Sequence, residues 1–143
     1  MYDAIERLRP DAVLHLGDHL EDAESMESVF SGVDFYHVPG NCDYFTNVPP
    51  SLTISLDGVR IFLTHGHLWN PEKLPPVPPD SVFAFGHIHL PVLRKEKSGL
   101  TVFNPGSISL PKGGNPPSFG FYRDHALRIL NLENGEEMAS LSL

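Results

Sequence analysis

The chain has 143 residues, of which 41% are hydrophobic, and this length is enough for one domain with a real core. Its formal net charge of −8 argues against a nucleic-acid partner. No apolar run is long enough to cross a membrane as a helix, and residues 1–6 do not have the pattern of a signal peptide. The single cysteine, Cys42, cannot form an internal disulfide and fits a reducing cytoplasm. We therefore expect one cytoplasmic domain over residues 1–143.

The first third of the chain predicts a strand, a helix and a second strand. Residues 1–9 have helical spacing and stop at Pro10, and the apolar residues 13–16 follow as a strand. Residues 21–30 predict a helix whose acidic start suits the helix dipole, and residues 35–38 predict the next strand. This order favours two parallel strands joined by a right-handed crossover.

The remainder predicts mainly antiparallel hairpins around one buried strand. Asp57-Gly58 is a strong hairpin signal between residues 52–56 and 59–63. The segment 71–80 has five prolines and can hold at most a turn or two of helix. The other expected strands are the buried run 82–85, the hairpin 92–96 with 100–103, and the pair 120–122 with 127–132, extended by 138–143.

Four of the predicted strands end in polar residues. Ligands bind at the carboxyl ends of strands in open α/β sheets, so these ends should converge. One carboxylate, one amide and several imidazoles are the mixed donor set of a hydrolytic metal centre. We expect a shared, metal-sized pocket formed by Asp18, Asn41, His65, His87 and His89.

Several sequence blocks are similar to the motifs of the calcineurin-like metallophosphoesterases, and most similar to those of the YfcE-type bacterial phosphodiesterases. The resemblance runs from about Ala12 to Tyr122. It implies an α/β fold, a two-sheet β-sandwich flanked by helices, here lacking the first strand. The blocks are Gly17-Asp18, Gly40-Asn41-Cys42-Asp43, Thr64-His65-Gly66-His67, Gly86-His87-Ile88-His89 and Phe103-Asn104-Pro105-Gly106-Ser107.

The resemblance also implies a reaction. The family hydrolyses phosphate esters with two divalent ions, often Mn²⁺, bridged by an aspartate and a water or hydroxide. Asp18 resembles the bridging carboxylate. Asn41, His65 and His87 resemble the further ligands of the second metal, and His89 resembles a ligand of the first. We expect a hydrolase that cleaves small phosphodiesters by attack of a metal-activated hydroxide.

One family motif is missing. The family begins with a strand that ends in Asp-x-His and gives two ligands to the first metal, but no Asp-x-His precedes Asp18. We expect that Met1 lies inside a longer protein; the alternative is a variant that has lost a site. As written, the first metal keeps only Asp18 and His89, so we expect one ion bound well, a second bound weakly, and impaired activity. A strand missing from a sheet leaves free edges that favour a homo-oligomer.

The proton donor and the functional class have alternatives. The leaving oxygen could be protonated by Cys42, by His67 or by a metal-bound water. Cys42 is equally explained as a small, half-buried structural residue. The intact histidines favour a phosphodiesterase, whereas the missing Asp-x-His favours a non-catalytic, protein-binding module of the same fold. A metallo-β-lactamase-like site is a poor fit, because Asp-His does not follow His67.

Overall fold

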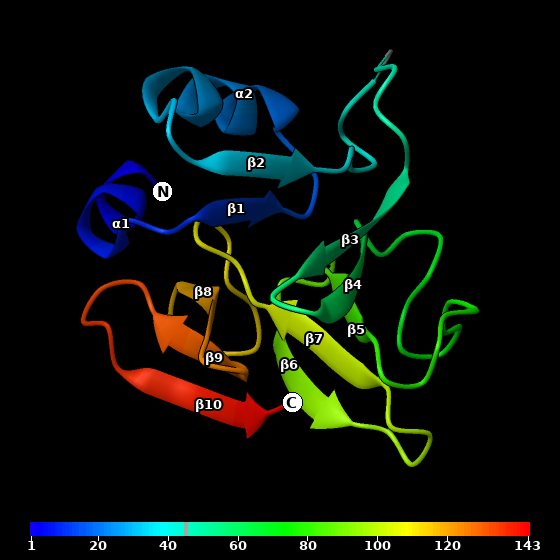
Figure 1. Ribbon diagram of the computed structural model, residues 1–143. Helices are drawn as coiled ribbons and strands as arrows, with labels where there is room; N and C mark the ends of the chain where they lie inside the picture. Colours follow the sequence, from blue (N-terminus) through cyan, green and yellow to red (C-terminus); the bar gives the residue numbers. More distant parts are fainter. Residues whose placement is uncertain (45) are drawn as a thin grey trace.

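The computed structural model describes residues 1–44 and 46–143, and their strands form two layers with helices at one end (Figure 1). One layer is a five-stranded sheet. The other layer consists of a parallel pair of strands and a separate three-stranded sheet. The α/β sandwich predicted from the sequence is therefore confirmed, although in the described residues its second layer is divided between two sheets.

The N-terminal part is the predicted parallel unit. β1 and β2 pair in parallel, from Ala12 opposite Asp34 to His15 opposite His37. Helix α2 connects them and packs on β2. The first turn of the helix contains Glu21 and Asp22, whose negative charges are favoured at the positive end of the helix dipole. The bounds of this unit are α1 (Tyr2–Leu8), β1 (Ala12–His15), α2 (Leu20–Val29) and β2 (Asp34–His37).

The five-stranded sheet has the order β3-β4-β5-β7-β6, with parallel strands at its centre. β5 is the middle strand, and all four of its residues are buried. This burial explains its continuous apolar sequence, because both faces of a central strand are covered. The strands are β3 (Ser51–Leu56), β4 (Val59–Thr64), β5 (Val82–Phe85), β6 (Pro91–Lys95) and β7 (Thr101–Pro105).

The third sheet is an antiparallel meander in the order β10-β9-β8, with a register shift between Glu137 and Ala139. All three strands had been expected, and their ends shift by a few residues. The strands are β8 (Ser118–Arg123), β9 (Ala126–Asn131) and β10 (Glu137–Ser142).

The main core lies between the two layers. Leu63 of β4 and Ala84 of β5 belong to the same buried cluster as Ile129 of β9 and Val38, which follows β2. Burying a valine, leucine or isoleucine side chain contributes about 1.5–3 kcal/mol. The cluster therefore joins all three sheets and fixes where their strand ends point.

A second cluster covers the opposite face of the five-stranded sheet. Phe83 and Phe85 stack there with ring centroids 5.1 Å apart. Trp69 and Val77, from the proline-rich connection between β4 and β5, pack against them. Within this connection the structure forms turns and no helix, as its five prolines predict.

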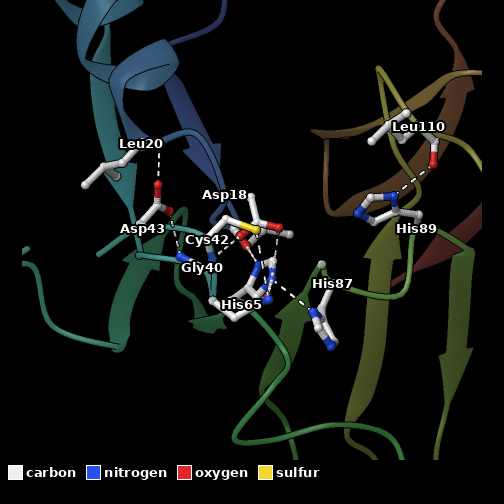
Figure 2. A network of polar contacts seen from close by, with 12 residues as sticks. Asp18, Leu20, Gly40, Cys42, Asp43, His65, His87, His89 and Leu110 are labelled. Atoms are coloured by element: carbon white, nitrogen blue, oxygen red, sulfur yellow. Dashed lines mark hydrogen bonds and ion pairs between the residues drawn. The ribbon is translucent and has the colours of Figure 1, made fainter. Parts of the chain in front are cut away.

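The carboxyl ends of β1, β2, β4 and β5 lie in one region of the molecule, as expected for parallel neighbours (Figures 1 and 2).

None of the helices in the described ranges 1–44 and 46–143 is both long and apolar enough to cross a membrane.

Candidate metal centre

The turns after β1 and β2 touch each other and bring Asp18 close to Asn41. Gly17 has φ +94°, and a Cβ added there would lie 2.7 Å from Nδ1 of His65 and 2.8 Å from the amide nitrogen of Gly40. Glycine is therefore required at position 17 both for its backbone angle and for the close approach.

His65, at the end of β4, is the centre of the polar cluster and is only 2% exposed. Its Nδ1 donates a hydrogen bond to the carbonyl oxygen of Leu16 at 2.7 Å, so Nε2 presents its lone pair to the other side. Burial lowers the pKa of His65, more than the Leu16 hydrogen bond and Asp18 raise it. The imidazole is therefore neutral near pH 7, which is the form that binds metals.

Three further atoms of types that bind metals lie around Nε2 of His65. Oδ1 of Asn41 lies 2.9 Å away, Nδ1 of His87 lies 3.1 Å away and Oδ2 of Asp18 lies 3.4 Å away. Together with His65, these three side chains come from four different strand ends. The structure thus brings together four of the five expected ligands, Asp18, Asn41, His65 and His87.

The backbone binds only one of the two carboxylate oxygens of Asp18. Its Oδ1 accepts a hydrogen bond from the amide of Cys42 at 3.0 Å, while Oδ2 faces His65. Partial burial acts to raise the pKa of Asp18, but the Cys42 hydrogen bonds and the nearby imidazoles lower it below its ordinary value. The carboxylate is therefore ionised and able to bind a cation.

His67 and His89 occupy different places around this cluster. The His67 ring centroid lies 5.7 Å from that of His65 and 6.5 Å from that of His87, so His67 borders the cluster. His89 lies apart from it, and Nδ1 of His89 donates a hydrogen bond to the carbonyl oxygen of Leu110 at 2.8 Å (Figure 2). This bond uses Nδ1 of His89. It leaves Nε2 available to bind an ion other than one held by Asn41, His65 and His87.

Cys42 is exposed, so the expectation that it is half-buried is wrong. A hydrogen bond between the thiol and the Asp18 carboxylate raises the pKa of Cys42, and the negative charge of Asp18 adds to the effect. The thiol therefore keeps its proton beside the cluster.

The donor set fits a divalent cation in type and in pairwise spacing. Two ligands at right angles around an ion with bonds of about 2.1 Å lie about 3.0 Å apart, close to the Asn41 and His87 contacts of His65. In residues 1–44 and 46–143, however, no three His, Cys, Asp or Glu side chains already surround one point. A complete set of metal ligands therefore needs the Asn41 amide oxygen and a rotation of the exposed His87 side chain.

Asn104, in the Asn-Pro-Gly-Ser block, supports the strand end that carries His87. Asn104 is fully buried, and its Nδ2 donates to the carbonyl oxygen of Gly86 at 2.8 Å. It thus holds the residue before His87, and the Asn-Pro-Gly-Ser block was the available signal. The buried Nδ1 of His15, in β1, has no hydrogen-bond partner in the described parts of the chain.

Residues 1–123 match the Calcineurin-like phosphoesterase superfamily domain. The chain is 39% identical over 114 residues to Phosphodiesterase YfcE of Escherichia coli, covering 74% of this chain and 61% of that protein. It is 30% identical over 139 residues to the probable metallophosphoesterase YsnB of Bacillus subtilis, covering 87% of this chain and 70% of that protein. The chain thus spans less than two thirds of the length of YfcE.

Solved structures agree with this assignment. The structure of the phosphoesterase YfcE from E. coli superposes with a TM-score of 0.86 at 30% identity, over 99% of this chain and 88% of that one. Vps29 from Entamoeba histolytica complexed with Zn²⁺ superposes with a TM-score of 0.70 at 20% identity, over 98% and 86%, which shows the shared fold alone. With the sequence match over residues 1–123, these similarities place the chain in the calcineurin-like phosphoesterase superfamily.

Proposed function

We propose that this chain is a divalent-metal-dependent phosphodiesterase that hydrolyses small phosphodiesters. The observation that carries the proposal is the surroundings of His65 Nε2. With its proton on Nδ1, this nitrogen faces the Asn41 oxygen at 2.9 Å and the Asp18 carboxylate at 3.4 Å. Lone pairs that face one another repel, and a cation bound among them removes the repulsion.

We assign one ion to Asp18, Asn41, His65 and His87, and a second, weaker site to Asp18 and His89. Mn²⁺ is the ion that the family resemblance implies, and the Asp18 carboxylate and Asn41 amide supply the oxygen ligands that suit it. When bound, the ions would polarise the phosphoryl group and lower the pKa of an attacking water. This weaker site of Asp18 and His89 corresponds to the first metal of the family, and its incomplete ligand set would impair the activity of this chain.

The protein groups have separate roles in this proposal. Asp18 balances the positive charge and is oriented by the Cys42 amide. The protonated Cys42 thiol and the neighbouring His67 are the two side chains able to protonate the leaving oxygen. The net charge of −8 favours a small substrate over nucleic acid or a membrane surface, and the single cysteine fits the cytoplasm.

A non-catalytic, protein-binding role is the second candidate. It is favoured by the position of His89, which lies apart from the other donors and leaves the second ion with two protein ligands (Figure 2). Under this alternative the chain would bind one ion without turning over a phosphodiester.

Metal analysis and hydrolysis of bis(p-nitrophenyl) phosphate test the proposal together. We expect about one Mn²⁺ per chain after dialysis and Mn²⁺-dependent hydrolysis. His87→Ala should lower metal content and activity together. We expect the metal affinity to fall by about 10-fold or more, because the change removes a metal ligand. His125→Ala, a change to an exposed histidine paired with Asp57, is the control. Metal binding without hydrolysis would support the second candidate, and no metal binding would refute both assignments.

Replacing Cys42 by Ser tests the proton donor. We expect an altered rate or pH profile with unchanged metal content, since the Cys42 amide bond to Asp18 remains available. Unchanged kinetics would show that Cys42 does not protonate the leaving oxygen, and would assign this role to His67 or to a metal-bound water.

A further inference from the structure

The turn after β1 and the turn after β2 each supply one donor of the candidate centre. The first turn comprises residues 17–19, which contain Asp18, together with Leu20 at the start of α2; residues 40–43 form the second turn and contain Asn41. The relative position of these two backbone segments therefore decides whether both oxygens can reach His65.

The two turns exchange carboxylate-to-amide hydrogen bonds. Asp18 of the first turn accepts from the amide of Cys42 in the second at 3.0 Å. Asp43 of the second turn accepts from the amide of Leu20 in the first at 3.0 Å, through Oδ1. Each turn thus offers a carboxylate to the backbone of the other, and Figure 2 shows both bonds beside His65.

Asp43 also closes its own turn. Its Oδ2 accepts from the amide of Gly40 at 2.8 Å, and its amide donates to the Gly40 carbonyl at 3.2 Å. Both carboxylate oxygens are therefore occupied by backbone donors. The two residues between Gly40 and Asp43 are Asn41 and Cys42, so this closure sets the direction of the Asn41 side chain and the Cys42 amide.

The hydrogen bond between Asp43 and the Leu20 amide also stabilises the start of α2. Leu20 is the first residue of α2, and the preceding residue, His19, makes no capping bond with its side chain. Asp43 satisfies this free amide from another segment, and its negative charge suits the N-terminus of the helix. An acid is therefore favoured at position 43 although it lies close to Asp18.

We propose that Asp43 is a positioning residue for the metal centre, acting through Asp18 and Asn41 and making no contact with the ion itself. This inference rests on the proposed function. Loss of the Asp43 carboxylate frees the Cys42 amide from Asp18 Oδ1 and lets the Asn41 oxygen leave His65. Supporting residues of this kind change metal affinity by about 10-fold to 100-fold.

Isothermal titration of the whole chain with Mn²⁺ alone tests the inference. We expect Asp43→Ala to raise the Kd for Mn²⁺ by at least about 10-fold. Asp43→Asn, which keeps one acceptor oxygen, should give an intermediate Kd. Asp34→Ala removes an exposed carboxylate from β2 and should leave the Kd unchanged.

Loss of stability must be separated from loss of positioning. Ile129→Val, in the core and on the third sheet, lowers the melting temperature without touching either turn, and its Kd should match that of the unchanged chain. Tight binding by Asp43→Ala would overturn the inference, as would an equal loss of affinity in Ile129→Val. An unchanged chain that binds no Mn²⁺ would instead overturn the proposed function.

Discussion

Three candidate ligands have a backbone conformation that side chains normally avoid. Asp18, His87 and His89 have φ values of 61°, 63° and 58°. The left-handed region costs a non-glycine residue about 1–2 kcal/mol, because Cβ approaches the following carbonyl oxygen. Such strain is typical of functional sites, where the surrounding structure holds it in place. Here it lies in the turns that follow β1 and β5, where Asp18 and His87 meet the cluster and His89 faces the Leu110 carbonyl.

Replacing His87 by Gly should therefore separate stability from metal binding. The glycine variant should have a free energy of unfolding about 1 kcal/mol higher than His87→Ala, because alanine keeps the strained Cβ. Both variants should lose the same metal affinity. Urea unfolding of the metal-free proteins measures the difference, and equal stabilities would show that position 87 carries no strain.

His15 should make stability depend on pH. Burial lowers the pKa of His15 from 6.5, so the unfolded chain takes up a proton before the folded chain does. Its contribution to stability is complete above about pH 6.5 and is lost as the pH falls through the folded pKa. Urea unfolding at pH 7.5 and 5.5 should show a smaller loss for His15→Gln than for the unchanged chain. An equal loss in both would assign the effect to other groups, such as His65.

At the scale of elements, strand identities were predictable and the contacts between strand ends were not. The parallel pair and the Asp57-Gly58 hairpin follow from local patterns, and Asp57 and Gly58 have the positive φ values of such a turn. The Leu16 carbonyl that orients His65 is 49 positions away in sequence. A backbone carbonyl has no residue-specific signal, so the tautomer of His65 could not be predicted.

The candidate site was predicted as a set of residues, but its subdivision required the fold. Asp18, Asn41, His65 and His87 were expected together because each follows an apolar run, and the strand ends do meet. The separate position of His89 depends on the Leu110 carbonyl, which lies in a glycine- and proline-rich loop. Such loops have no hydrophobic period from which a contact could be inferred.

Asn104 connects β7 to the loop that carries His87, and its replacement should affect both stability and metal binding. Asn104→Ala leaves the Gly86 carbonyl and the Gly106 amide without their partner. Each unsatisfied buried group costs about 1–3 kcal/mol. We expect thermal unfolding to show this loss and calorimetry to show weaker Mn²⁺ binding. Asn115→Ala, in an exposed turn, is the matched control.

The whole molecule has several sheet edges with free backbone groups. β1 pairs only with β2, and β8 pairs only with β9, within the described residues. The residues of β1 are all half-buried, unlike those of β5. Free edges of this kind can pair with another chain.

We therefore expect self-association that increases with protein concentration. Sedimentation velocity across a 100-fold dilution series, about two decades of concentration, should show a monomer that gives way to larger species, because edge pairing is bimolecular. A single monomeric species throughout the series would show that the edges of β1 and β8 are protected by their surroundings.

The candidate centre also lies between two parts of the chain that share no strand pairing within residues 1–44 and 46–143. Asp18 and Asn41 belong to the unit built around β1 and β2, whereas His65 and His87 extend from the five-stranded sheet. An ion bound by all four would act as a cross-link between these units. Local opening of the β1–β2 unit would then require release of the ion. The exchange rates of its amide hydrogens would therefore record how fully the protein is loaded with metal.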